Sequence, residues 1–148
     1  MAGLVYVAAF APDSDEVVGD IAKSYPPPPT FAAPIIDKQG FMSLSTEAMV
    51  KHFAWDLPAA EARALAATQG PIIASAFGTK VSKVAWKTKP SWYIVASKDQ
   101  AIAPDEERFF AKRMKAKTTE LGTSHVPMLS KPKDVAAVII DAAAKASN

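Results

Sequence analysis

The sequence predicts an α/β fold in which three parallel strands carry flanking helices and a long inserted helical lid. The opening apolar run at residues 4–10 (Leu-Val-Tyr-Val-Ala-Ala-Phe) is typical of a strand buried on both faces, as parallel sheets require. The last third of the chain alternates strand-like and helix-like segments, which implies right-handed parallel crossovers. Residues 11–90 separate the first two strands and are too long for one crossover helix, so we expect an inserted lid within a single domain over residues 1–148.

Two more strands are expected in the C-terminal part. Residues 91–97 form a second continuous apolar run, which is entered from Pro90. Residues 117–121 form a third and shorter candidate, which Gly122 closes. Each of these strands is followed by a helix-like segment, as a parallel sheet requires.

The two C-terminal helices carry clear end signals. Pro104 suits the first turn of a helix that runs to Lys115, with acidic residues at its start and basic residues at its end, as the helix dipole favours. For the final helix we expect Ser130 as N-cap and Pro132 in the first turn. Its apolar face should consist of Val135, Val138, Ile139 and Ala142.

The lid segment should contain a weak helix near residues 15–24 and two firmer helices. Ser45 is placed to cap a helix at residues 46–55, and Pro58 and Gly70 bracket another at residues 59–69. The four prolines at residues 26–29 predict a stiff polyproline II connector. An SH3-type ligand is the alternative interpretation of this proline run.

Composition excludes several classes of function. The chain has 148 residues, a 49% hydrophobic content sufficient for a core, and a net charge of only +2 with scattered basic residues, which argues against nucleic acid binding. It has no cysteine, so disulfides and thiolate chemistry are excluded. Pro12 and Asp13 interrupt the apolar N-terminus far short of a membrane span, and we expect a cytoplasmic protein without a membrane contact.

An aspartate and a histidine follow neighbouring strands. His125 lies in the loop at residues 122–128 (Gly-Thr-Ser-His-Val-Pro-Met), and Asp99 follows the preceding strand. The carboxyl ends of parallel strands gather catalytic groups, and a buried carboxylate beside a histidine fixes the imidazole tautomer. On the pattern alone, Asp99 could instead cap the next helix and His125 could be an ordinary loop residue. The second histidine, His52, is expected on the surface or in the lid.

These segments, taken in order, resemble the C-terminal part of bacterial α/β-hydrolases of the esterase and hydroxynitrile-lyase-like branch. The resemblance rests on residues 89–99, on residues 104–107 (Pro-Asp-Glu-Glu), on residues 122–128 and on the opening run through Asp13. It covers the whole chain. It implies that Asp99 is the acid and His125 the base of a catalytic triad.

The sequence departs from that family at the nucleophile. The family places its serine on a Gly-x-Ser-x-Gly elbow, and no two glycines of this chain have that spacing. Ser75 precedes Asp99 and His125 in the right order, but Ile73 and Phe77 occupy the positions that the strained elbow needs small. We therefore expect Ser75 to be a lid residue. The glycine-rich oxyanion loop is missing too. Because residues 1–3 lead directly into a buried strand, we expect a chain truncated at its N-terminus, with a genuine start, a misplaced start codon and a cloning boundary all open.

Aromatic and aliphatic side chains of the lid are expected to wall a substrate pocket. The predicted wall residues are Phe31, Phe41, Met42, Phe53, Trp55 and Phe77 from the lid, with Ile102 and Met128 from the sheet side. No metal-ligand spacing, nucleotide motif or other sign of a cofactor occurs.

The expected function is hydrolysis of a small apolar ester through an acyl-enzyme, with His125 as base and Asp99 as its orienting acid, once a nucleophile-bearing half is present. A lyase reaction fits the resemblance equally. The alternative is a truncated binding or accessory domain without turnover. The expected partners are an ester-like small molecule and, through the strand at residues 4–10, either a second copy or a complementing chain.

Overall fold

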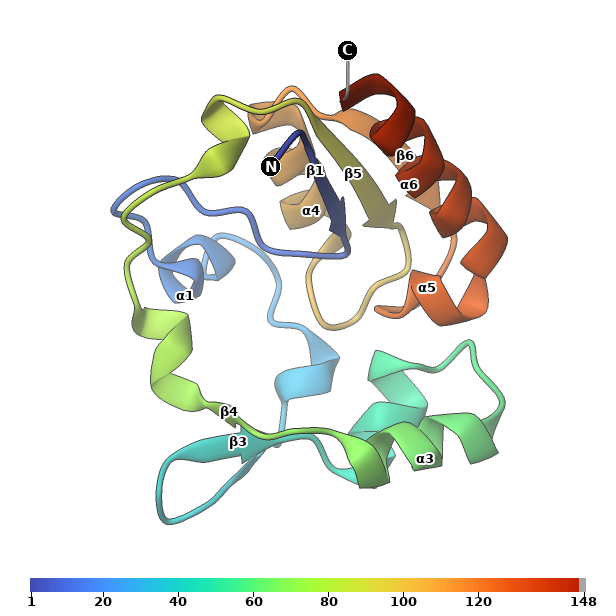
Figure 1. Cartoon of the computed structure of the whole chain (residues 1–148). Coiled ribbons are helices and arrows are strands. Elements are labelled where there is room, and N and C mark those ends of the chain that lie inside the picture. Colours follow the sequence, from blue (N-terminus) through green and yellow to red (C-terminus); the bar gives the residue numbers. More distant parts are fainter. Residues whose placement is uncertain (147–148) are drawn as a thin grey trace.

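A parallel three-stranded sheet forms the centre of the molecule (Figure 1). In this computed structural model, which describes residues 1–146, the strands are β1 (Leu4–Val7), β5 (Ser91–Ala96) and β6 (Lys117–Leu121), in the order β1-β5-β6. The predicted parallel α/β architecture is thus confirmed. Because all three strands run the same way, the loops that follow β5 and β6 meet at one edge of the sheet.

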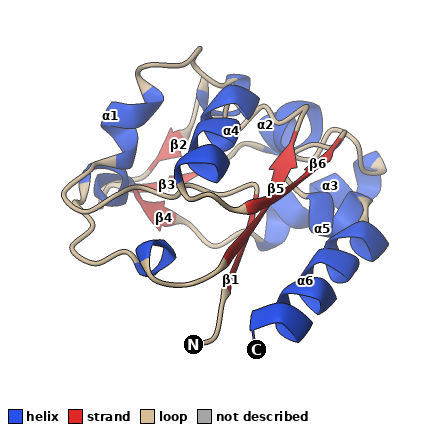
Figure 2. Cartoon of the chain, turned by 90° about the horizontal axis from the view of Figure 1, so that it is seen from above, coloured by secondary structure: helices blue, strands red, loops and turns tan. Residues whose placement is uncertain are grey.

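Helices cover the two faces of this sheet (Figure 2). α4 (Pro104–Arg113) packs on the face that presents Tyr93 and Val95, and its Phe110 belongs to the same buried cluster. α6 (Pro132–Ala146) packs on the opposite face, where the Trp92 indole donates a hydrogen bond to Asp141 at 2.9 Å. Every residue of β5 is buried, which explains the continuous apolar sequence of this strand.

β1 differs from its prediction in length and burial. The strand was expected over residues 4–10 with both faces covered, but it ends at Val7 and all four of its residues are only half-buried. Ala8 has a φ of 44°, a left-handed conformation that turns the chain out of the sheet. β1 pairs with β5 on one side and, within residues 1–146, with no strand on the other. An edge position explains the incomplete burial.

The start of α6 also differs from its prediction. Ser130 is not the N-cap, because it belongs to a separate short helix, α5 (Pro127–Ser130), where its hydroxyl donates to the Val126 carbonyl at 3.2 Å. Ile139, expected on the buried face, is 47% exposed. It borders a groove of about 460 Å³ beside β1, so the apolar face of α6 extends past the edge of the sheet.

The lid lies at the carboxyl edge of the sheet (Figure 1). Its helical elements are α1 (Val18–Ala22), the 3-10 turn Pro29–Phe31, α2 (Thr46–Ala48), which continues as a π-helical turn (Met49–Phe53), α3 (Ala59–Thr68), and the 3-10 turns Ala74–Gly78 and Ala85–Lys87. The predicted cap is confirmed, since the Ser45 hydroxyl accepts a hydrogen bond from the Ala48 amide at 3.1 Å. No helix within residues 1–146 is long and apolar enough to cross a membrane.

The sequence predicts a helical lid, but the lid of the structure is only partly helical. It also contains an antiparallel sheet of β2 (Ile35–Ile36), β3 (Phe41–Ser43) and β4 (Ile72–Ile73). The Asp37 carboxylate accepts the amides of Gln39 and Phe41 and shapes the turn between β2 and β3. Strands of two or three residues are too short to show the alternation by which a strand is recognised in a sequence.

The free edge of β1 generates a prediction. It carries no charge or proline, the usual protections against edge pairing, and it adjoins exposed apolar surface on α6. We expect the 148-residue chain to self-associate through this edge, and Val7→Lys to reduce the association in analytical ultracentrifugation. The matched control is Thr118→Lys on β6, a strand that already carries Lys117 and Glu120. A wild-type chain that sediments as a single monomer at all concentrations would contradict this account.

Candidate active site

Asp99 and His125 meet at the carboxyl edge of the sheet. Asp99 follows β5 and His125 follows β6, and these two strands are neighbours. His125 Nδ1 lies 2.6 Å from Asp99 Oδ2, so the hydrogen bond expected between the two side chains is present. The two groups come from loops that the parallel pairing of β5 and β6 brings together.

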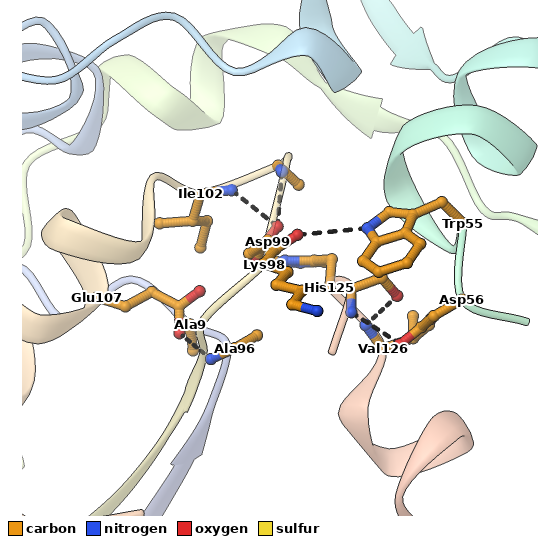
Figure 3. A network of polar contacts seen from close by, with 12 residues as sticks. Ala9, Trp55, Asp56, Ala96, Lys98, Asp99, Ile102, Glu107, His125 and Val126 are labelled. Carbon is orange, nitrogen blue, oxygen red and sulfur yellow. Dashed lines mark hydrogen bonds and ion pairs between the residues drawn. The ribbon is translucent and has the colours of Figure 1, made fainter. Parts of the chain in front are cut away.

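A tight turn holds the Asp99 carboxylate in place. Its side chain is fully buried, and Oδ1 accepts hydrogen bonds from the amides of Ala101 at 2.6 Å and Ile102 at 3.2 Å (Figure 3). Asp99 does not cap α4, whose N-cap is Ala103. With Oδ1 fixed by two backbone donors, Oδ2 remains free to orient the imidazole.

The imidazole of His125 is fixed on its other sides by the lid. The His125 amide donates to the Phe53 carbonyl at 3.2 Å, and the Phe53 ring lies 4.6 Å from the imidazole, between ring centroids. The side chain is 20% exposed. Nε2 has no hydrogen-bond partner among residues 1–146, so this nitrogen is open to a reacting group.

Two further contacts join the lid to the loops that carry Asp99 and His125. Asp56 accepts the Ser124 amide at 2.9 Å, directly beside His125. Trp55 donates from its indole to the carbonyl of Lys98, the residue before Asp99, at 3.3 Å (Figure 3). The end of the π-helical turn is therefore bound to both loops, and the lid contributes to the geometry of the pair.

A second buried carboxyl lies behind Asp99. Glu107 on α4 is fully buried, and its Oε2 accepts the Ala96 amide at 2.9 Å (Figure 3). Burial and, next to it, a hydrogen bond with the Asp99 carboxyl raise the pKa of Glu107 well above the usual range. Glu107 is thus neutral near pH 7 and can donate that hydrogen bond.

Sequence reasoning missed this residue, because three acidic residues in a first turn are already explained by the helix dipole. The available signal was spacing. Glu107 precedes Phe110 and Ala111 by three and four positions, which places it on the buried face of α4.

An apolar cavity of about 410 Å³ lies within the lid and extends to Val126, the residue after His125. Apart from Val126, its walls come from the π-helical turn, α3, the small sheet and the 3-10 turns of the lid. They include Phe31, Met42, Leu44, Met49, Phe53, Leu65, Phe77 and Val126. Phe53 both lines this cavity and contacts the imidazole. A bound apolar group would therefore lie beside His125.

The structure brings only some of the predicted wall residues to this cavity. The cavity is lined by Phe31, Met42, Phe53 and Phe77 but not by Phe41, Trp55, Ile102 or Met128. Trp55 is held at the Lys98 carbonyl, Ile102 is buried in the turn that binds Asp99, and Met128 is 41% exposed on α5. Hydrophobicity alone does not distinguish a cavity wall from a core or surface position.

Within residues 1–146, the two other candidates from the sequence form no hydrogen bond with Asp99 or His125. His52 Nδ1 is 2.6 Å from the side-chain oxygen of Gln100, a contact between lid and sheet. Ser75 is exposed in the 3-10 turn Ala74–Gly78, and within residues 1–146 no hydrogen bond joins it to His125. Neither residue adds a nucleophile to the site.

Comparison with known proteins identifies the family to which this fold belongs. A family model described as "Alpha/beta hydrolase family" matches residues 1–138. No curated protein matches the chain.

Several solved structures share the fold. Polyneuridine aldehyde esterase is 14% identical with a TM-score of 0.79, over 95% of this chain and 62% of its own. A pyrethroid hydrolase from Sphingobium faniae JZ-2 is 21% identical with a TM-score of 0.71, over 97% and 61%. An extracellular α/β-hydrolase from a Paenibacillus species is 19% identical with a TM-score of 0.69, over 93% and 60%. The chain thus spans about three fifths of the length of these structures.

The hydrogen bonds of Asp99 predict which nitrogen of His125 carries the proton. In Asp99→Asn the amide oxygen should take the place of Oδ1, where two backbone amides bind it, so that the new NH₂ group faces Nδ1. The neutral imidazole would then shift its proton from Nδ1 to Nε2. Nitrogen NMR of the ring reports the tautomer. Asp105→Asn, an exposed neighbour, should leave it unchanged, and a wild-type ring with its proton on Nε2 would contradict the site geometry.

Glu107 predicts a pH dependence of stability. Since the pKa of Glu107 is raised in the folded state, its contribution to stability is full below its unfolded pKa and declines as the pH rises above that value. Glu107→Gln should therefore stabilise the chain relative to wild type, by an amount that grows by more than about 1 kcal/mol from pH 5 to pH 8, given ~1.4 kcal/mol per pKa unit. Urea unfolding at several pH values measures this difference. A pH-independent effect would show that Glu107 is ionised in the fold.

Proposed function

The chain belongs to the α/β-hydrolase family, and from this premise we propose that it supplies the acid and the base of a serine-type carboxylic ester hydrolase. Asp99 is the acid and His125 the base. The observation that carries the proposal is the 2.6 Å contact between His125 Nδ1 and an Asp99 carboxylate that is fully buried and held by backbone amides.

In the proposed mechanism His125 first accepts a proton and then donates it, both when the acyl-enzyme forms and when water hydrolyses it. Asp99 holds the proton on Nδ1, so the lone pair of Nε2 accepts the proton of an attacking serine hydroxyl. The serine oxygen forms a bond to the ester carbonyl carbon, and the resulting imidazolium is stabilised by the adjacent carboxylate. The bond between the carbonyl carbon and the alcohol oxygen then breaks, His125 donates the proton to this oxygen, and the acyl group remains on the serine. Water, activated by the same nitrogen, completes the hydrolysis.

The nucleophile must come from a segment outside these 148 residues. None of the glycines allows a Gly-x-Ser-x-Gly elbow, and Ser75 is exposed in the lid. The same outside segment would supply the hydrogen-bond donors that stabilise the oxyanion. This stabilisation is usually the largest single contribution to the rate enhancement in reactions of this kind. It could be part of the same protein or a complementing chain.

The cavity favours an apolar ester as substrate. Its walls consist mostly of apolar side chains. Two of them, Phe53 and Val126, lie next to His125. A cavity of about 410 Å³ is in the range of sites that bind small organic ligands. The structures of similar fold are named as an esterase and a pyrethroid hydrolase, which agrees with ester chemistry.

A binding module without turnover is the second candidate. The observation that favours it is the lack of a nucleophile elbow in this chain, beside an apolar cavity that is nevertheless formed. The two candidates differ in what lies upstream in the reading frame. A Gly-x-Ser-x-Gly motif there supports the hydrolase, and a stop codon with no complementing chain supports the binding module.

The 148-residue chain by itself should be inactive. With acid and base but no nucleophile, it should hydrolyse p-nitrophenyl butyrate no faster than its His125→Ala variant. A fluorophosphonate probe should label no serine. Stoichiometric labelling of Ser75 would instead identify that residue as the nucleophile and contradict the assignment.

A nucleophile-bearing form provides the positive test. In the longest in-frame product that contains this sequence, Asp99→Asn should lower kcat on p-nitrophenyl butyrate by roughly 10⁴-fold, the loss that accompanies the wrong tautomer in such triads. His125→Ala should lower it at least as far. Asp105→Asn is the matched control and should retain wild-type kcat. Full activity of the Asp99→Asn variant would rule out the proposed role.

A further inference from the structure

A second cavity, of about 270 Å³, lies beside the first and contains one polar side chain. Phe31, Met42 and Phe77 line both cavities and form the wall between them. Apart from Glu106 on α4, the residues that line the second cavity are apolar.

The carboxyl of Glu106 is buried, and one of its oxygens has no partner. The residue is 2% exposed, and within residues 1–146 its buried Oε1 has no hydrogen-bond partner. Its neighbours on the helix each have a polar partner: Asp105 pairs with Arg108 at 2.7 Å, and Oε2 of Glu107 accepts a hydrogen bond from the Ala96 amide. Buried polar groups are almost always paired, so a lone carboxyl at a cavity wall indicates a group that a ligand completes.

Three aromatic rings share this cavity with Glu106. Phe10, Phe31 and Phe77 line it, and Phe77 makes edge contacts with the other two at centroid distances of 6.4 and 6.3 Å. The faces of aromatic rings attract cations, and rings around a carboxylate are a recurring arrangement for binding substituted ammonium groups. A hydroxyl group would gain only the hydrogen bond, whereas an ammonium gains the ion pair and the ring contacts as well.

We propose that this cavity is a binding site for the ammonium group of an otherwise apolar molecule, with Glu106 as its counter-ion. The cavity could also serve as a subsite for an ester that carries an amine, because only the shared wall separates it from the first cavity. That role rests on the proposed function. As a binding site it needs no turnover.

The ionisation of Glu106 makes the site sensitive to pH. Burial raises the pKa of Glu106 to about 7, so the carboxylate that would attract an ammonium forms between pH 6 and pH 8. The titratable groups that interact with Glu106 are Tyr25 after α1 and Tyr93 on β5, and its helix neighbours are Asp105 and Glu107. Burial raises the pKa of both tyrosines, so neither acquires a charge in this range.

The test compares two probes of matched shape on the 148-residue chain by isothermal titration calorimetry. At pH 8, 2-phenylethylamine should bind at least ~10-fold more tightly than 2-phenylethanol, the ratio that a buried charge-assisted hydrogen bond provides. In Glu106→Gln the two probes should bind equally. Asp105→Asn removes the same charge from the exposed neighbour and should leave the preference intact.

The wild-type chain gives an independent readout if Glu106→Gln does not fold. Affinity for 2-phenylethylamine should rise about tenfold between pH 5.5 and pH 7.5 as Glu106 ionises, with no change for 2-phenylethanol. Equal affinity for the two probes, or amine binding that does not change with pH, would overturn the proposal.

The His125→Ala variant separates this proposal from the proposed function. It should bind 2-phenylethylamine as the wild type does, because His125 does not line the second cavity. Amine binding without ester hydrolysis in the nucleophile-bearing form would refute only the hydrolase role. Hydrolysis without amine selectivity would refute only the Glu106 site.

Discussion

The organisation of this protein depends on one buried carboxylate, Asp99, which no lysine or arginine among residues 1–146 pairs with. Asp99 is stabilised by two backbone amides on one oxygen and by His125 on the other. A buried charge without such donors would cost several kcal/mol. These donors come from the turn after β5 and the loop after β6, so the arrangement requires the two strands to be parallel neighbours. Glu107, kept neutral by burial, extends the same network into α4.

The sequence was sufficient to predict the sheet and the Asp99–His125 contact, and the physical reason is topological. Apolar runs identify buried strands, and parallel strands bring their following loops to one edge whatever the detailed packing. Short elements were missed, because β2 and β4 have only two residues each and derive their pairing from the lid around them. The prediction of a cavity wall was wrong for Trp55, Ile102 and Met128. A sequence alone does not show whether an apolar side chain lies at a cavity wall, in the core or on the surface.

The acidic triplet at the start of α4 shows most clearly what a sequence leaves open. Asp105, Glu106 and Glu107 all suit the first turn of a helix. A rotation of 100° per residue sends them to three environments: solvent beside Arg108, an apolar cavity, and the back of Asp99. Only the packing of α4 against β5 and the lid distinguishes a surface charge from a carboxyl at a cavity wall and from a carboxyl behind Asp99.

The central claim is that the open nitrogen of His125 faces a nucleophile supplied from outside these residues. The most direct measurement is a crystal structure of the longest in-frame product that contains the sequence. The account predicts a serine Oγ within about 3 Å of His125 Nε2, while Asp99 remains bound to Nδ1. A structure in which Nε2 faces the lid or solvent, with no hydroxyl in reach, would contradict it.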